Sequence, residues 1–241
     1  MRYYVGVDLG TSSVKLMLVA ETGDIQKTVS RPYPVSYPKN GWSEQSPYLW
    51  WDAFLEAMTE LLEGGYAPSV RAIGVGGQMH GLVALDGDDN VLRPAILWND
   101  GRTADEVVEL NEGVGKEKLS ALTANIAFAG FTAPKILWMR KNEPELFAQI
   151  KKIMLPKDYL NYRLTGAFVC DMSDASGMLL LDVKNRAWSK EMVALCGIDE
   201  TVLPTLHESV DVVGTVLPIW AEKFGLASDV KVVAGAGDNA A

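Results

Sequence analysis

The sequence predicts an α/β domain with a mixed sheet flanked by helices. Short apolar segments rich in β-branched residues feed glycine-rich turns, and helical segments alternate with them along the chain. The chain has 241 residues, of which 48% are hydrophobic, so it has enough apolar surface for a real core. We therefore expect an ordered chain that forms one large domain or two small ones.

The N-terminal segment predicts the first three strands of the sheet. Residues 3–8 are β-branched and aromatic, which is typical of a buried strand, and residues 10–13 predict a tight turn. Residues 14–20 predict a second strand, so the chain opens with a hairpin. Residues 25–30 predict a third strand. The prolines at 32, 34 and 38 then break regular structure.

A helix and a further strand follow the prolines. Ser46 is a good cap residue and Pro47 is favoured in the first helical turn. Apolar residues then recur at helical spacing: Trp50, Phe54, Ala57 and Leu61. Residues 70–75 predict a strand that ends in Gly76-Gly77.

The middle of the chain is less regular. We expect a polar turn between short strands at 86–90, a strand at 96–98 and a helix at 102–111. From about 113 to 205 the pattern predicts mostly helices and loops.

Four later elements have clear signals. Helices are predicted at 157–164, 189–196 and 218–224. A final strand is predicted at 230–234, and a glycine-rich turn follows it at 235–239.

Charge and cysteine content exclude several classes of protein. The formal net charge is −9, which repels nucleic acid phosphates and anionic lipids, so we expect neither as a partner. Cys170 and Cys196 lack metal or redox spacing, which favours a reduced protein in the cytoplasm. Asp8 interrupts the N-terminal apolar run, which argues against a signal peptide, and no run of about 18 apolar residues predicts a membrane span.

The first candidate site is Asp8-Leu9-Gly10-Thr11-Ser12-Ser13-Val14-Lys15, at the end of the first strand. Amides and hydroxyls of such a turn can converge on a phosphate and cradle its oxygens. The carboxylate of Asp8 can hold Mg²⁺, directly or through water. The spacing of a Walker loop is missing. On this segment alone, an ordinary hairpin turn is an equal alternative.

The second candidate site is Gly76-Gly77-Gln78-Met79-His80-Gly81. It follows the carboxyl end of a strand, where α/β folds bind ligands. His80 can exchange hydrogen bonds with sugar hydroxyls, or it can be a satisfied loop histidine. With no cysteine or second histidine clustered beside it, the segment does not predict a metal site.

The third candidate site is Gly235-Ala236-Gly237-Asp238-Asn239-Ala240. Its small residues allow a substrate to approach the backbone, and Asp238 can accept a proton from an attacking hydroxyl. The alternatives are a helix cap and the G-x-G-x-x-A fingerprint of a dinucleotide site. A charged Asp inside a turn that binds pyrophosphate argues against the fingerprint.

Seven segments, in this order, resemble the FGGY family of carbohydrate kinases. The resemblance extends from residue 5 to the last residue, and within the family it is strongest to members that phosphorylate D-xylulose, mainly through Gln78 to Gly81. The segments are DLGTSSVK at 8–15, GQMHG at 77–81, ILWNDGR at 96–102, GFTAPKILW at 130–138, LPKDYL at 155–160, DMSDASG at 171–177 and GAGDN at 235–239.

The resemblance implies an actin-like, ribonuclease-H-like fold and an ATP-dependent kinase that uses Mg²⁺. It implies that Asp238 is the catalytic base and that Asp8 holds Mg²⁺ through water. The implied phosphate contacts are Gly10, Thr11, Ser12 and, more weakly, Lys15, which is otherwise a solvated strand residue. The implied sugar contacts are Gln78, Met79, His80, Asn239 and Trp98, although Trp98 can equally be a core residue.

The length of the chain sets a further expectation. Family members are about twice as long, with a second similar domain that binds most of the ATP. We expect residues 1–241 to be the sugar-binding half, ending where the ATP-binding domain begins, and to be inactive alone. D-xylulose and that second domain are the expected partners, and a homodimer is left open. The alternatives are a family kinase for gluconate, ribulose or glycerol, a non-enzymatic actin-like module, and a dinucleotide-dependent oxidoreductase.

Overall fold

A seven-stranded mixed sheet forms the centre of the fold. The computed structural model describes all residues, 1–241. The strand order is β13-β14-β5-β1-β2-β3, with β15 also paired to β5. Strand β2 is antiparallel to both of its neighbours, β1 and β3, whereas β5 is parallel to both β1 and β14. The bounds are β1 Tyr3–Leu9, β2 Ser13–Ala20, β3 Ile25–Pro32, β5 Val70–Gly77, β13 Val212–Thr215, β14 Lys231–Val233 and β15 Ala236–Gly237.

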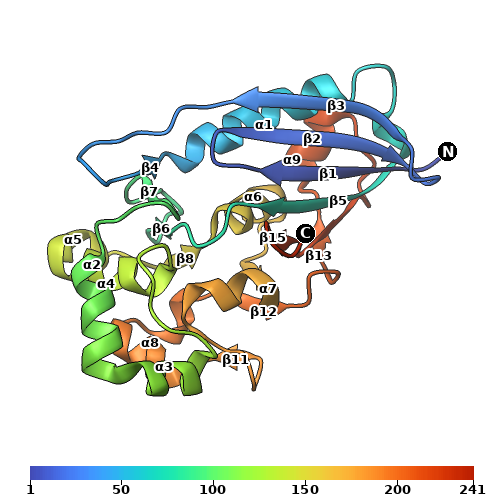
Figure 1. Ribbon diagram of the computed structural model, residues 1–241. Coiled ribbons are helices and arrows are strands. Elements are labelled where there is room, and N and C mark those ends of the chain that lie inside the picture. The colour runs from blue at the N-terminus through green and yellow to red at the C-terminus, as the bar shows by residue number, and fades with distance from the viewer.

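Helices cover one face of this sheet. Helix α1 (Pro47–Leu61) crosses behind β2 and β3, and α6 (Pro156–Thr165) and α9 (Pro218–Phe224) lie on the same side (Figure 1). The predicted stripe of α1 is fully buried, with Trp50, Phe54, Ala57 and Leu61 at 0% exposure. Ser46 is the cap residue of α1, as predicted, but its side chain makes no capping hydrogen bond.

Apolar and exposed side chains alternate along β1, which explains why helices cover only one face of the sheet. Val5, Val7 and Leu9 are buried toward α1, whereas Tyr4 and Asp8 on the other face are exposed. This second face carries a groove of about 470 Å³, which Asp8 lines.

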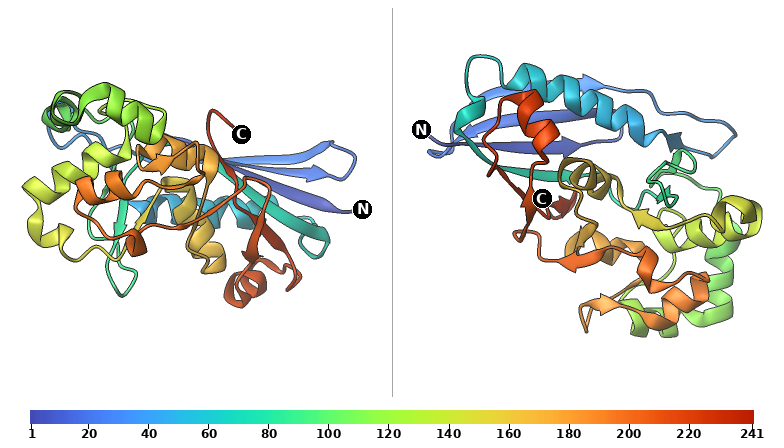
Figure 2. Two further views of the ribbon diagram at one scale, coloured as in Figure 1. Left: turned by 90° about the horizontal axis from the view of Figure 1, so that it is seen from below. Right: turned by 180° about the vertical axis from the view of Figure 1, so that it is seen from behind.

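A second lobe, which is largely helical, lies beyond one end of the sheet (Figure 2). It has its own hydrophobic cluster, in which α4 and α8 contribute buried Ile136, Met139 and Met192. The helices of this lobe are α2 Ala104–Val108, α3 Lys116–Thr123, α4 Thr132–Asn142, α5 Pro144–Phe147, α7 Met172–Ala175 and α8 Lys190–Cys196. Four tighter or wider turns complete the helices of the chain: η1 Ala67–Ser69, η2 Glu109–Gly115, η3 Ser176–Met178 and η4 Glu200–Val202.

Four short strand pairs connect the two lobes and brace the second one. They are β4 Glu44–Gln45 with β7 Ala95–Ile96, β6 Val83–Leu85 with β8 Lys152–Met154, β9 Val169–Asp171 with β12 Thr205–His207, and β10 Leu181–Asp182 with β11 Ala187–Trp188. The sequence predicts few strands between 113 and 205, so β8 to β11 and most of β12 are corrections to that prediction. Strands of two or three residues lack room for an alternating pattern, and tertiary pairing alone fixes them.

Two other elements differ from the sequence prediction. The strand expected at 96–98 ends at Ile96, because Leu97 and the following residues turn to bond with the segment at 41–43. The helix expected at 102–111 starts at Ala104 and widens into a π-helical turn from Glu109. No helix of the structure is long and apolar enough to span a membrane.

Candidate active site

The carboxyl ends of three neighbouring strands form the floor of the site. Leu9 of β1 lies opposite Gly77 of β5, and Gly77 lies opposite Gly237 of β15, with all three strands parallel. The amide of Gln78 donates to the Leu9 carbonyl at 2.8 Å, and the amide of Asp238 donates to the Gly77 carbonyl at 2.9 Å. The three predicted motifs are therefore adjacent, at the sheet edge where α/β folds bind ligands.

A cavity of about 260 Å³ opens between these motifs. Its walls combine small, polar and aromatic residues, and each of them is a candidate from the sequence. They are Gly10, Thr11, Gln78, Met79, His80, Trp98, Asp238 and Asn239. A concave site of this size with several polar groups is suited to a small polyhydroxylated ligand.

Trp98 forms one wall of the cavity. It is 48% exposed, so it is not a core residue. Its Nε1 donates to Oγ1 of Thr11 at 2.9 Å, which joins this wall to the turn after β1.

The remaining predicted residues lie beside this cavity. Asp8 lines a neighbouring groove of about 470 Å³ on the uncovered face of the sheet, and Asp238 borders this groove as well. Lys15 is exposed on β2, directly opposite Asp8, and Ser12 is exposed in the turn. Asp238 thus stands between the cavity and the groove. Its carboxylate is exposed, and it bonds to no other group of the chain.

The turn after β1 is held from several sides. Tyr33 donates its hydroxyl to the Gly10 carbonyl at 2.6 Å, and Gln78 Nε2 approaches the same carbonyl at 3.4 Å. Gln45, buried in β4, donates Nε2 to the Thr11 carbonyl at 2.7 Å. The sequence gives no signal for Gln45, since its role depends on a contact between segments 34 residues apart.

The backbone and ring of His80 are both constrained. Its φ of 67° lies in the left-handed region, which a residue with a side chain seldom adopts. Nδ1 lies 3.0 Å from the Gly177 carbonyl, so this nitrogen carries the proton and Nε2 is left as an acceptor. Burial, assisted by the Lys135 ammonium, lowers the pKa of His80 to about 4, which keeps the ring neutral at pH 7.

A buried charge cluster lies beneath the loop that carries Asp238. Lys157, fully buried, contacts Asp158 at 2.5 Å and Asp171 at 2.8 Å. Burial opposes ionisation of Asp171, but the Lys157 ammonium lowers its pKa. Burial raises the pKa of Asp174, which no hydrogen-bond donor contacts, well above its usual value. Lys157 thus favours the ionised form of Asp171, whereas burial favours the neutral form of Asp174.

This cluster is connected to the loop backbone. Asn161 Nδ2 donates to the Ala234 carbonyl at 2.9 Å, and Ser173 Oγ accepts from the Gly237 amide at 3.3 Å. Ser173 in turn donates to Asp171 at 2.5 Å. Because Ala236-Gly237 forms a strand against β5 rather than a tight turn into a helix, the loop does not have the geometry of a dinucleotide fingerprint.

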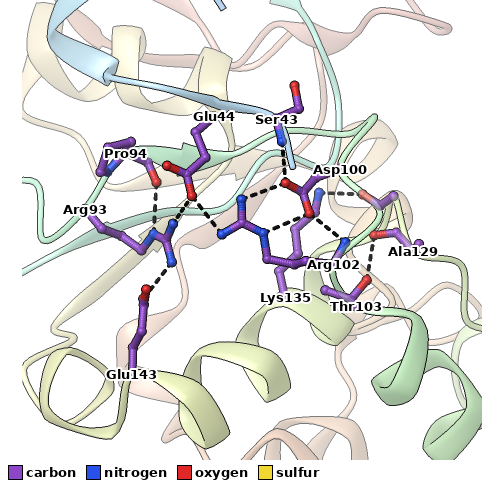
Figure 3. Close-up of polar contacts among 11 residues, drawn as sticks. Ser43, Glu44, Arg93, Pro94, Asp100, Arg102, Thr103, Ala129, Lys135 and Glu143 are labelled. Atoms are coloured by element: carbon purple, nitrogen blue, oxygen red, sulfur yellow. Dashed lines mark hydrogen bonds and ion pairs between the residues drawn. The ribbon is translucent and has the colours of Figure 1, made fainter. Parts of the chain in front are cut away.

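A second polar cluster supports the segment that carries Trp98 (Figure 3). Arg102 pairs with Asp100 at 2.7 Å and with Glu44 at 2.7 Å, and Arg93 bonds both Glu44 and Glu143. Asp100 also accepts the Ser43 amide at 2.6 Å. The ring of Trp42 lies 3.7 Å from the Arg102 guanidinium, as in a cation–π contact.

Residues 3–241 match the model of the FGGY family of carbohydrate kinases, N-terminal domain. The chain belongs to the FGGY family. The actin-like fold and the kinase family predicted from the sequence are confirmed.

The relatives of this FGGY chain include named xylulose kinases. The chain is 47% identical over 244 residues to the xylulose kinase of Escherichia coli strain K12, and the match covers 99% of this chain and 49% of that protein. A xyloylose kinase structure from Brucella ovis has a TM-score of 0.95 at 42% identity, over 99% of this chain and 49% of the other. The chain thus spans about half the length of the curated relatives it matches.

The fold alone does not distinguish sugars within the family. A gluconate kinase structure from Lactobacillus acidophilus has a TM-score of 0.94 at 29% identity, over 98% of this chain and 48% of that chain. Substrate choice therefore has to be argued from the side chains of the cavity.

Proposed function

We propose that the protein transfers the γ-phosphoryl group of ATP to the 5-hydroxyl of D-xylulose, and that this chain supplies the sugar-binding half. The observation that carries the proposal is the cavity itself. Its eight lining residues come from four of the segments that resemble FGGY kinases, and they surround one exposed carboxylate, that of Asp238. The naming of the E. coli relative as a xylulose kinase favours xylulose among the sugars.

The proposed chemistry divides among the residues as follows. Met79, His80, Trp98 and Asn239 hold the sugar, and His80 Nε2 accepts a hydrogen bond from one of its hydroxyls. Asp238 orients the 5-hydroxyl and accepts its proton as the oxygen bonds to the γ-phosphorus. The bond from that phosphorus to the bridging oxygen breaks, and ADP leaves. Because phosphoryl transfer has a loose transition state, positioning and charge stabilisation supply most of the catalysis.

We propose that the turn after β1 contacts the phosphates. The amides around Gly10, with the hydroxyls of Thr11 and Ser12, can cradle phosphate oxygens, and Lys15 is a weaker candidate on the adjacent strand. Asp8 and Asp238 line one groove, and such hard carboxylate donors fit Mg²⁺ held through water. Bound Mg²⁺ would neutralise the charge of the phosphates.

The contacts to sugar and to ATP are proposed to belong to different domains of the enzyme. We infer that residues 1–241 form the sugar-binding domain and that most ATP contacts belong to a second domain, as in relatives of twice the length. A kinase has to exclude water from the transferred phosphoryl group, which requires closure around the substrate. The chain alone is therefore proposed to bind sugar weakly and to lack turnover.

Calorimetric titration of the 241-residue chain tests the sugar assignment. D-xylulose is expected to bind, with glycerol and D-gluconate as controls that bind at least about tenfold more weakly, since a site built for one set of hydroxyls rejects others. Tighter binding of D-gluconate would assign the chain to a different sugar of the same family. Absence of all binding would contradict the claim that this half forms the sugar site unaided.

A further inference from the structure

The His80 backbone requires an outside support. His80 lies in the wall of the sugar cavity with φ 67°, a conformation that costs energy for a residue with a side chain. Such a conformation persists where neighbouring groups over-determine it.

The start of α4 supplies that support. Lys135 Nζ donates to the His80 carbonyl at 2.8 Å, and Thr132 Oγ1 donates to the same oxygen at 3.1 Å. Both side chains belong to residues at 0% exposure, so water does not compete for these bonds. One carbonyl thus receives two buried donors, one of them on an ammonium group.

Lys135 also bonds to a residue that packs against Trp98, another residue of the cavity wall. Its Nζ donates to the Gly130 carbonyl at 2.6 Å. Gly130 packs so closely on Trp98 that a Cβ added to it would lie 2.7 Å from the Trp98 carbonyl oxygen. A single ammonium group therefore ties the His80 loop to the segment that rests on Trp98.

Stability alone does not account for this lysine. A fully buried ammonium is costly unless it is paired, and Lys135 forms no ion pair with a carboxylate. Figure 3 shows it beside Asp100 and Arg102, whose charges are already matched to each other. Burial lowers the pKa of Lys135 to about 7, with Asp100 and Arg102 acting on it in opposite directions.

We propose that Lys135 is a positioning residue for sugar recognition, which with Thr132 fixes the left-handed backbone of His80 and sets its distance from Trp98. The inference rests on the proposed function, because the ligand of the cavity is the sugar. The ammonium has a second effect, since its positive charge helps to keep the His80 ring neutral and able to accept a hydrogen bond.

Steady-state kinetics of Lys135→Met in the full-length enzyme test the proposal. The KM for sugar is expected to rise about 10- to 100-fold, because a misplacement of about 1 Å can cost that much, while the KM for ATP stays within about threefold. Thr132→Val is expected to raise the sugar KM less, since Lys135 remains, and Thr132→Ser is expected to restore it. Lys141→Met is the matched control, on the same helix but with its side chain 41% exposed and paired with Glu106 and Glu109.

Two further readouts separate positioning from a general structural role. The melting temperature of Lys135→Met is expected to stay within about 5 °C of wild type, because the lost hydrogen bonds are offset by removal of a buried charge. The KM for sugar is expected to rise in acid, as His80 becomes protonated. In Lys135→Met this rise is expected to begin at a higher pH, toward the ordinary pKa of histidine near 6.5, and in Thr132→Val at the same pH as in wild type. The other charges facing this region, Asp100, Arg102 and Asp238, are the same in every variant.

The outcomes distinguish this inference from the proposed function. A wild-type enzyme that phosphorylates no sugar contradicts the proposed function, and the inference falls with it. Normal wild-type turnover with an unchanged sugar KM in Lys135→Met overturns the inference alone. If Lys135→Met does not fold, Thr132→Val decides, and an unchanged sugar KM in that variant overturns the inference equally.

Discussion

At the scale of single residues, the contacts of His80 fix both the position of its ring and its protonation state. Its Nδ1 bonds to the Gly177 carbonyl, and its own carbonyl accepts from Lys135 and Thr132. Its ring lies 4.9 Å from the ring of Phe131, centroid to centroid, with the two planes tilted by 47°. Nε2 is therefore the one ring nitrogen left to accept a hydrogen bond from a ligand.

The depressed pKa of His80 predicts a loss of stability in acid. The folded-state pKa is about 4, below the ordinary value of 6.5, so the unfolded chain binds the proton first as the pH falls. The free energy of unfolding is therefore expected to decrease between pH 6.5 and 4, by on the order of 1 kcal/mol once solvent screening of the partly exposed ring is allowed for.

Denaturant titrations at pH 7 and pH 4.5 measure this loss. Wild type is expected to lose more stability than His80→Asn, and His207 is present in both proteins. An equal loss in the two proteins would show that His80 is not buried in a neutral state.

Sequence reasoning found the lining of the cavity but not its supports. Gly10, Thr11 and Asp238 lie in motifs whose residue types already indicate phosphate and proton chemistry. Gln45 and Lys135 act through hydrogen bonds to backbone carbonyls of distant segments, those of Thr11 and His80. Lys135 lies in the segment GFTAPKILW, which resembles the family, but the segment gives it no role, and Gln45 has no sequence signal at all; the tertiary structure shows what each of them contacts.

At the scale of elements, close packing of η3 on the loop after β5 determines the shape of the site. A Cβ added to Gly177 of η3 would overlap the His80 ring, so this glycine allows the ring to reach its observed position. The position of His80 is thus set by two elements of the second lobe, α4 and η3, and not by the sheet from which it emerges.

Gly177→Ala in the full-length enzyme tests this packing. The added methyl group is expected to displace the imidazole and to raise the KM for sugar about tenfold or more, with a smaller change in kcat. Gly113→Ala is the control, because a Cβ there meets nothing within 4 Å. Equal sugar KM values in the two variants would argue against a defined position for His80.

The elements themselves were predicted with uneven success, for a physical reason. The cap and apolar stripe of α1 are local signals, and so are the β-branched and aromatic residues of β1 and the pattern of the helix at 218–224. The two-residue strands β4, β10 and β11 form only because another segment lies beside them. Their positions are consequences of the fold and could not be predicted from local sequence.

At the scale of the whole molecule, the sheet and the second lobe meet at one site. The sheet supplies the turn after β1 and the loop that carries Asp238, while the second lobe fixes the His80 loop and Trp98. Buried clusters support both sides, around Lys157 under the Asp238 loop and around Arg102 under the Trp98 segment. The proposed sugar site thus lies between two lobes, and a buried polar cluster supports each side of it.

In the proposed reaction, Asp238 is the base that accepts a proton from D-xylulose. The most direct measurement is ATP-dependent phosphorylation of D-xylulose by the full-length enzyme and by its Asp238→Asn variant. We expect turnover with xylulose in the wild type and a kcat about 10² to 10⁴ lower in the variant, with little change in the KM for sugar. A wild type that releases no ADP with xylulose, or a variant that turns over at close to the wild-type rate, would contradict the account.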